Sequence, residues 1–436
     1  VHAGGVAVAA GGLLRVDALT AYLLAVVGVV ALNATWAGLE PRAAASAPDG
    51  WLAGLVCLFV AAMSLALLAD NLGVMWVAIE GTTITTAFLV GYRGGRRAVE
   101  AAWKYVVLGS VGVAVAFLGI VLLYAASDAG GVATLSWAAM TAHPLGLDRD
   151  LTRVGAALAA LGLATKAGLA PMHTWLPDAH SQAPAPVSGL MSGVLLSVAF
   201  YAILRIKAIS DAVLGPGQMR GLLVSAGLLS LLVAAGLILT QRDYKRMLAY
   251  SSIEHMGLLA LGAAVSGPVA TAAVLLHILG HGLAKSTLFV LAGRLLAAEG
   301  STTIADVRDL LGRRPAIAVP WLVAMAALLG LPPSGLFFTE VAIIGAGFDR
   351  GLGWVMAVAL ALLLIAFTGL ARHTLSMTLS RPGAQGIPGA GQGRAGPAGP
   401  LLPVALALTV VAGIGFAAWP LRGVLAGAVA ALGVAS

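Results

Sequence analysis

The sequence is poor in charged residues and in cysteine, and each deficit excludes a class of protein. Only 10% of the 436 residues are charged and 60% are hydrophobic, whereas soluble domains carry about 25% charge. So apolar a chain would not stay dispersed in water, which excludes a soluble enzyme and indicates a polytopic helical membrane protein, all-α in class. The single cysteine, Cys57, lies in an apolar segment, which excludes a disulfide framework and a thiolate metal site.

Motifs for redox cofactors and nucleotides are also missing. The chain has no Walker motif, dinucleotide fingerprint, haem-attachment CxxCH or nucleophile elbow, so we expect no cofactor of its own. The net charge of +7 does not indicate a nucleic-acid partner, because the basic residues fall largely in short loops, where membrane topology requires them.

Apolar segments and glycine are, in contrast, abundant. The 56 glycines fit a membrane protein, because small residues let transmembrane helices approach closely. About twelve spans, each near the roughly 20 residues that a bilayer requires, are predicted. They lie near residues 17–37, 51–70, 72–92, 103–127, 151–170, 185–209, 218–240, 245–264, 268–294, 316–347, 352–379 and 401–420.

Basic residues gather in three loops and set the predicted orientation. The loops are 93–97, 241–246 and 306–314, and even numbers of predicted spans separate them. Since Lys and Arg accumulate on the cytoplasmic side, all three are predicted to be cytoplasmic, with both termini outside the cell membrane. The Gly/Pro-rich segment 381–400 is predicted to be a flexible cytoplasmic loop, followed by a C-terminal helix at 401–420.

Proline interrupts two of the predicted spans. One breaks at Ala170 and Pro171, and the other within GLPPSG at 330–335. Proline removes a backbone donor, and inside a bilayer the freed groups need protein or water partners. Broken helices in two halves of a chain indicate an ion or substrate path, and a simple kink or re-entrant loop is the structural alternative.

Titratable residues lie inside the apolar spans, although a charge at the bilayer midplane costs about 2.5–3.5 kcal/mol. They are Glu80, Lys166, His255, His277, His281, Lys285 and Glu340. Glu80 and Lys166 are predicted to face each other as an ion pair on adjacent helices. Such a pair either switches protonation state or is a static structural contact.

His277, His281 and Lys285 recur every four residues, so they share one helix face. Two histidines at this spacing can ligate a metal, but the stripe offers no carboxylate or thiolate to complete the site. We therefore predict a proton relay and no metal, with structural hydrogen-bonding histidines as the alternative.

Three further charged residues have simpler interpretations. Glu254 lies near the cytoplasmic end of its helix, where water would solvate it. Asp17 stands at the start of the first span and is predicted to cap it. Arg205 lies near the outer end of its span and is predicted to extend its guanidinium to the interface.

Four motifs that contain these residues resemble the antiporter-like subunits of respiratory complex I and its relatives, over roughly residues 70–345. The most similar branch is the hydrogenase-4 component F type, found in membrane-bound group 4 NiFe hydrogenases and formate hydrogenlyases. Glu254 before His255 and EAAWKY at 100–105 favour that branch. The four motifs are KAGLAPMHTWLPDAHS at 166–181, YSSIEHMG at 250–257, HGLAKSTLF at 281–289 and GLPPSGLFFTE at 330–340.

The resemblance implies a fold and a set of partners. The fold would contain two inverted five-helix repeats, each with one broken helix, here about 51–209 and 218–379. The chain would be a non-redox subunit that moves protons along a central polar axis. Its expected partners are other membrane subunits, a hydrophilic redox arm of NiFe hydrogenase or dehydrogenase subunits, lipid, and the protons themselves.

The resemblance also implies roles for individual residues. Glu80 and Lys166 would form the Glu–Lys pair of the first half-channel, and Glu340 would be the terminal charged residue of the second. The relay groups of the central axis would be His255, His281 and Lys285. Supporting roles are expected for Asp178, His180, Glu254 and His277.

Two departures from the family pattern leave other functions open. Ser197, in GVLLS at 193–197, stands where complex I relatives usually carry a lysine, so water or His255 would have to fill the gap after Lys166. Members of the family also usually have more spans than the twelve or so predicted here, and the missing spans are expected at the N-terminus. The alternatives are an Mrp-type cation/proton antiporter subunit and a structural membrane anchor with a degenerate channel. Ser197 favours the anchor, whereas the retained charged residues count against it.

Overall fold

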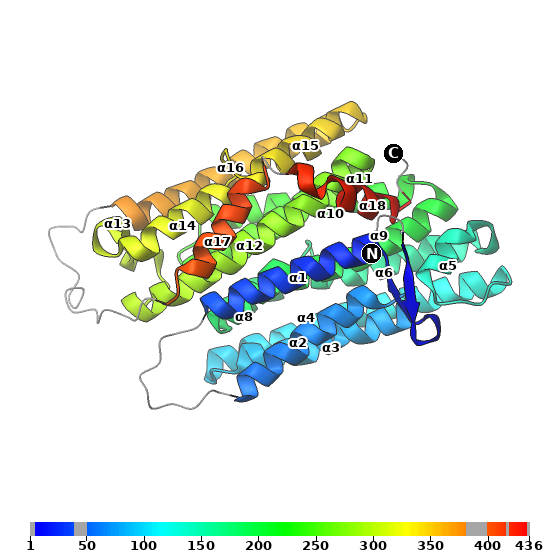
Figure 1. Cartoon of the computed structure of the whole chain (residues 1–436), viewed down its shortest axis with the longest axis horizontal. Helices are drawn as coiled ribbons and strands as arrows, with labels where there is room; N and C mark the ends of the chain where they lie inside the picture. The colour runs from blue at the N-terminus through cyan, green and yellow to red at the C-terminus, as the bar shows by residue number, and fades with distance from the viewer. Residues whose placement is uncertain (1–4, 39–49, 381–398, 416–417, 434–436) are drawn as a thin grey trace.

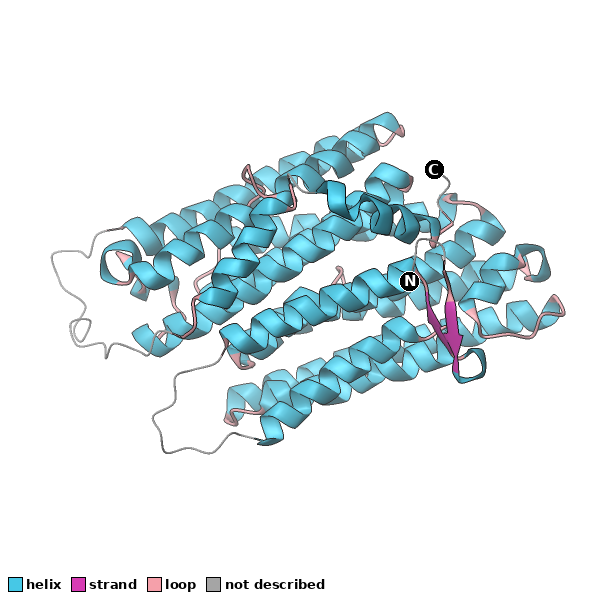
Figure 2. Cartoon of the chain, in the orientation of Figure 1, coloured by secondary structure: helices cyan, strands magenta, loops and turns pink. Residues whose placement is uncertain are grey.

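The computed structural model describes residues 5–38, 50–380, 399–415 and 418–433. Figures 1 and 2 show long helices packed side by side in an elongated bundle. Within the described residues the only sheet is a small hairpin of β1 (Ala7–Ala9) and β2 (Leu14–Val16) at one end of the bundle. The predicted helical membrane class is confirmed, since helices satisfy their own backbone hydrogen bonds where no water is present.

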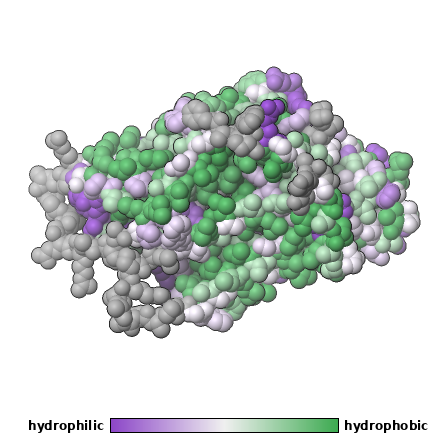
Figure 3. Space-filling model, viewed as in Figure 1, coloured by the Kyte–Doolittle hydropathy of each residue, from purple (hydrophilic) through white to green (hydrophobic). Residues whose placement is uncertain are grey.

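In the described part of the chain, nine helical segments are long and apolar enough to cross a membrane. Figure 3 shows apolar side chains over much of the visible face, as lipid contact requires. The nine are α1 (Ala18–Ala37), α2 (Gly50–Leu68), α3 (Leu72–Gly91), α4 (Arg96–Ala129), the pair α8 (Ala185–Leu190) and α9 (Leu196–Leu214), α10 (Gly217–Leu239), α11 (Tyr244–Val265), α12 (Pro268–Glu299) and α16 (Gly353–Leu379).

Both predicted interruptions are present. The first separates α6 (Arg149–Ala167) from α7 (Trp175–Gln182), and the second separates α14 (Pro315–Leu328) from α15 (Gly335–Asp349). Gly168 ends α6 with a φ of 72°, which glycine adopts without a Cβ penalty. These breaks place Lys166 at the end of one half-helix and Glu340 near the start of another.

Other boundaries differ from the predicted spans. A π-helical turn, Met191–Leu195, divides the span predicted at 185–209. The helix predicted at 401–420 is instead α17 (Leu402–Gly413) followed by α18 (Ala418–Ala430), because glycine at 413 and 415 weakens a continuous helix. The loop predicted at 381–400 lies outside the described residues, apart from its last two. The short elements are α5 (Trp137–Ala142), α13 (Leu310–Arg313) and the 3-10 turns Ala10–Gly12, Pro144–Gly146 and Ile304–Asp306.

Small residues let α4 and α6 cross closely. A Cβ added to Gly119 would lie 2.3 Å from the backbone nitrogen of Ala159, and one on Gly162 would lie 2.3 Å from that of Ala116. Larger side chains would force the two backbones apart. This crossing holds Lys166 against α4.

Two of the basic loops, 241–246 and 306–314, lie at the same end of the bundle. Asp243 forms a backbone bridge with Thr303, and the Asp309 amide donates to the carbonyl of Ser380 at 3.0 Å. The β-hairpin lies at the opposite end, where Leu14 bridges Ala69 (Figure 1).

Candidate functional site

Lys166 is fully buried at the end of α6 and faces α4. Its Nζ donates a hydrogen bond to the Tyr105 hydroxyl at 3.2 Å and lies 4.4 Å from the centre of the Tyr105 ring. A Cβ on Gly109, one turn further along α4, would lie only 2.7 Å from the same Nζ. The ammonium therefore occupies space that a glycine leaves open, and the aromatic face and hydroxyl replace part of its hydration.

Glu80, on α3, does not contact Lys166 directly. Its carboxylate accepts hydrogen bonds from Thr83 Oγ1 at 3.0 Å and Ser110 Oγ at 2.9 Å. None of the ion pairs between described residues joins Glu80 to Lys166. Helix α4 packs against both α3 and α6, and it offers a donor to the carboxylate and an acceptor to the ammonium. The two groups therefore form no direct ion pair among the described residues, and α4 supplies a hydrogen-bond partner to each of them.

The polar stripe of α12 faces the bundle interior. His277, His281 and Lys285 are all fully buried. Lys285 Nζ donates to the carbonyl of Leu248 at 2.7 Å and to the hydroxyl of Ser251 at 2.5 Å, both on α11. The four-residue spacing therefore puts the three side chains against α11 rather than against lipid.

His255 joins this stripe from α11. Its Nδ1 lies 3.0 Å from His277 Nε2 in a hydrogen bond, and its ring centre is 5.0 Å from that of His281. His277 Nδ1 is hydrogen-bonded to Thr339 Oγ1 at 2.8 Å. Neither ring nitrogen of His281 has a hydrogen-bond partner within the described residues.

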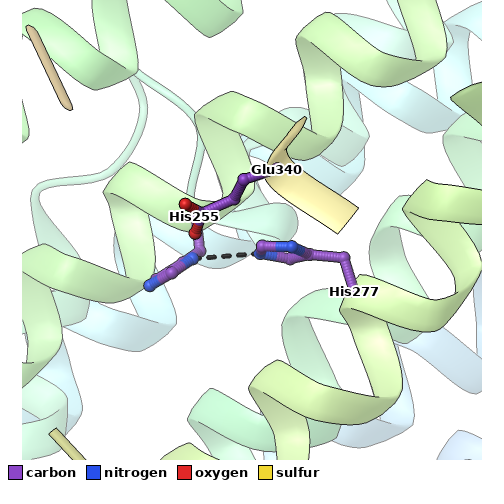
Figure 4. A group of neighbouring side chains, drawn as sticks. All are labelled: His255, His277 and Glu340. Carbon is purple, nitrogen blue, oxygen red and sulfur yellow. Dashed lines mark hydrogen bonds between the residues drawn. The ribbon is translucent and has the colours of Figure 1, made fainter. Parts of the chain in front are cut away.

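Glu340 reaches the histidines from α15. One oxygen of its carboxylate and one nitrogen of each of His255 and His277 lie within 4.8 Å of one another (Figure 4). Gly330, in the second break, makes room, because a Cβ there would lie 2.3 Å from Glu340 Oε2. The α12 stripe itself contains no carboxylate. The break therefore lets Glu340 bring a carboxylate to the histidines.

Glu254 is buried, so its predicted solvation at the helix end is wrong. Only 6% of the residue is exposed, and Oε2 has no hydrogen-bond partner among the described residues. Glu254 and Glu340 line the same cavity, about 470 Å³ in volume, between α11, α14, α15 and α16. On an isolated α11, Glu254 would face water. In the bundle it is covered by α15 and α16, the helices that follow the second break.

Asp178 and His180 lie two residues apart on α7 in different surroundings. Asp178 accepts from Arg246 Nη1 at 2.5 Å and from Lys104 Nζ at 3.2 Å, which fastens α7 to α11 and α4 near the bundle end. His180 is fully buried, and neither of its ring nitrogens has a partner among the described residues. Its ring lies 5.1 Å from that of Phe289, one turn along α12 from Lys285. The structure therefore brings His180, but not Asp178, into the interior.

Hydroxyl groups next to these residues were not predicted. Tyr105, Ser251 and Thr339 each hydrogen-bond a buried Lys or His side chain. Ser192, in the π-helical turn, pairs with Ser252 of α11 at 2.7 Å and links the two halves of the chain. Hydroxyl residues inside apolar helices follow no periodic pattern. The only feature of the sequence that could have identified these hydroxyl groups is their closeness along the chain to a charged residue.

Arg205 does not reach the interface, and that prediction is wrong. Its side chain is fully buried, Nη2 donates to Asp17 Oδ2 at 2.6 Å, and the guanidinium carbon lies 3.7 Å from the centre of the Trp137 ring. Asp17 also accepts from the Thr20 amide at 2.8 Å, so the predicted cap of α1 is present. A carboxylate and an aromatic face thus replace the water that the guanidinium would otherwise seek.

The known proteins that are similar to this chain in sequence include a hydrogenase-4 component F homolog and an NADH-quinone oxidoreductase subunit N. A hydrogenase-4 component F homolog from Methylacidiphilum infernorum (isolate V4) is 39% identical over 310 residues, which cover 70% of this chain and 65% of that protein. An NADH-quinone oxidoreductase subunit N from Desulforudis audaxviator (strain MP104C) is 31% identical over 319 residues, covering 71% of this chain and 62% of that protein. The matches thus span less than two thirds of the length of these relatives.

A chain of the membrane-bound sulfane sulfur reductase, an archaeal respiratory membrane complex, is similar in structure. The TM-score is 0.85 at 27% sequence identity, and the alignment covers 99% of this chain and 85% of that one. The family described as NADH:quinone oxidoreductase/Mrp antiporter, TM matches residues 69–367, a range that includes Glu80, Lys166 and Glu340. This match covers more than half of the sequence, and the chain therefore belongs to the NADH:quinone oxidoreductase/Mrp antiporter transmembrane family.

Proposed function

We propose that this chain is the proton-translocating membrane subunit of a multi-subunit oxidoreductase of the hydrogenase-4/formate hydrogenlyase or complex I kind. The observation that carries the proposal is the series of buried titratable side chains on α6, α7, α11 and α12, continued by the half-buried Glu80 on α3 and Glu340 on α15. Charged groups at membrane depth are costly and mark ion paths. The similarity to a hydrogenase-4 component F homolog supports a hydrogenase-type complex, with the redox chemistry in partner subunits and none in this chain.

In the first half of the path, Lys166 exchanges a proton under the influence of Glu80. Both groups lie beside α4, where Glu80 is bonded to Ser110 and Lys166 to Tyr105, and their attraction is strong because little water screens it. Protonation of Glu80 removes this attraction and favours release of the Lys166 proton toward the second half. Tyr105, which accepts a hydrogen bond from Lys166, orients the ammonium.

His180 fills the gap left by Ser197. The Ser197 hydroxyl is buried and has no hydrogen-bond partner in the described part of the chain, and a serine does not exchange a proton as lysine does. His180 is buried with both ring nitrogens free, and its contact with Phe289 places it beside the α12 stripe. We assign to His180 the transfer between Lys166 and Lys285, with water in the remaining distance.

The second half of the path runs along α11 and α12 to Glu340. Lys285 and Ser251 begin it, and His281, His255 and His277 continue it. Each histidine can accept a proton on one nitrogen and release one from the other, which suits it to a relay. Glu340, within 4.8 Å of the two histidines that precede it, ends the series.

The chain would lie in the cell membrane with its basic loops in the cytoplasm and both termini outside. Clustering of 241–246 with 306–314 at one end, opposite the β-hairpin, supports this orientation. The two inverted repeats would be about 51–209 and 218–379, with the broken helices α6/α7 and α14/α15 at corresponding positions.

Replacement of Lys166 by methionine tests the function. Met keeps an apolar stem but cannot exchange a proton, so the variant complex should assemble and lose most of its coupled proton movement. Lys166→Arg should also fail, because guanidinium does not release its proton. The matched control is Lys104→Met, which alters a half-exposed lysine whose ion pairs are screened by solvent and contribute little.

The assay is acidification of membrane vesicles that contain the whole complex, with assembly checked by native gel electrophoresis. Normal proton movement in a fully assembled Lys166→Met complex would favour the structural-anchor function. Sodium movement in place of proton movement would favour an Mrp-type antiporter subunit.

A further inference from the structure

We propose that His255, His277 and Glu340 form a binding site for a zinc ion. The three ligand atoms come from α11, α12 and α15 and lie within 4.8 Å of one another (Figure 4). Two imidazole nitrogens and one carboxylate oxygen form a donor set that zinc uses in proteins, with the fourth position left to water. The absence of a carboxylate on the α12 stripe therefore does not exclude a metal, because the tertiary structure supplies Glu340 from another helix.

The distance between the two histidine nitrogens is close to the one that a tetrahedral ion requires, and Glu340 has to approach them. Zinc bonds of about 2.0–2.1 Å place neighbouring donors roughly 3.4 Å apart. The facing nitrogens of His255 and His277 are 3.0 Å apart, so they need to separate by only a few tenths of an ångström. Glu340 forms no hydrogen bond with another described residue, so its carboxylate can move to the ion without breaking one.

Thr339 fixes the ring orientation that a ligand needs. Its hydroxyl donates to the carbonyl of Leu336 at 2.8 Å, so it accepts the hydrogen bond from His277 Nδ1. The Nδ1 of His277 therefore carries the proton, and the unprotonated Nε2 points at His255 and Glu340. Metal-bound histidines almost always donate their second nitrogen in this way, which fixes the tautomer.

Zinc binding moves one proton from one nitrogen of the His255 ring to the other. In the metal-free site His255 Nδ1 donates to His277 Nε2, so Nδ1 must lose its proton to bind the ion. The unpartnered Nε2 of the same ring can take that proton, which leaves the imidazole neutral. No oxidation or other bond change is involved.

The surroundings favour a divalent cation that binds both nitrogen and oxygen ligands. Glu254 lines the same cavity as Glu340, so two carboxylates oppose the two positive charges of the ion. The cavity of about 470 Å³, which Glu340 lines, provides space beside its carboxylate for a water as fourth ligand. Calcium and magnesium prefer six or more oxygen ligands, which this site does not provide.

Binding of the ion would occupy both histidines and Glu340 at once, and so block the second half of the path. This consequence rests on the proposed proton translocation, whereas the binding itself does not. Zinc would therefore act as an inhibitor of coupled proton movement, while leaving the helical bundle intact.

The binding test uses the full chain in lipid nanodiscs with zinc chloride, and zinc retained after gel filtration is counted. We expect about one ion per chain, and Co²⁺ in its place should give the intense visible absorption of tetrahedral nitrogen/oxygen coordination. Glu340→Gln and His277→Gln should each weaken zinc binding by at least about tenfold. Loss of a residue that only hydrogen-bonds a metal ligand already reduces metal affinity by about this factor, and these two residues would be ligands themselves. The matched control is His373→Gln, because His373 bonds the carbonyl of Ile238 on α10, outside the cluster.

Two results would overturn the site: no zinc retained by the folded wild-type chain, or equal affinity in Glu340→Gln and wild type. Gel-filtration profiles identify variants that fail to fold, and Glu340→Gln preserves the shape of the side chain. Zinc inhibition of acidification by wild-type vesicles, over the same concentration range in which the wild-type chain binds zinc, would support the blocking role. Specific binding without inhibition would retain the metal site and remove this cluster from the proton path.

Discussion

Gly109→Ala would add one methyl group beside the Lys166 ammonium. The new Cβ would lie 2.7 Å from Nζ and 3.4 Å from Thr83 Cγ2, with no backbone atom among its nearest neighbours. A normal contact of about 3.5 Å requires the ammonium to move by roughly 0.8 Å or more. Because Nζ ends a flexible side chain, that movement relieves most of the overlap, and the free energy of unfolding should fall by about 1 kcal/mol, the lower end of the range for overpacking.

The displacement should matter for transport even though it costs little stability. Lys166 Nζ is held at 3.2 Å from the Tyr105 hydroxyl, and a shift of this size alters that hydrogen bond and the approach to the next proton acceptor. A misplacement of about 1 Å at a reacting group can reduce a rate by roughly 100-fold. We therefore expect the initial rate of vesicle acidification to fall by about tenfold or more.

The matched control is Gly54→Ala, in α2. A Cβ there meets no atom within 4 Å, so this substitution should leave both assembly and transport unchanged. The measurement is the initial acidification rate per assembled complex, with thermal unfolding of both variants in parallel. Wild-type transport by a stable Gly109→Ala variant would refute the argument that the ammonium position controls proton transfer.

Three further predictions follow from the described contacts. Asp17→Asn should destabilise the chain by about 3–5 kcal/mol, measured by thermal unfolding in nanodiscs, because it leaves the buried Arg205 guanidinium without its counter-charge. Gly162→Ala should cost about 1–3 kcal/mol and reduce the yield of assembled complex, because its methyl group meets the α4 backbone rather than a movable side chain. His180→Phe should keep the packing yet lose most proton movement, whereas His173→Phe, at a less buried position, should retain it; equal rates in vesicles would exclude His180 from the path.

The membrane class and the main titratable groups could be predicted from the sequence. Runs of apolar residues identify the long helices because a bilayer has a fixed thickness, and a charge inside such a run is conspicuous because its cost is high. Lys166, Lys285 and Glu340 stand out for that reason. Proline likewise located both helix breaks, since its effect on the backbone is local.

The partners of those groups were decided by helix packing. Glu80 is bonded to Ser110 rather than to Lys166, and Arg205 is paired with Asp17 across 188 residues of sequence, because neighbouring helices bring together positions that no short-range pattern connects. The same is true of the cluster of His255, His277 and Glu340, whose members come from three helices. Periodicity along one helix assigns a residue to a face, but only the arrangement of the other helices determines which group that face meets.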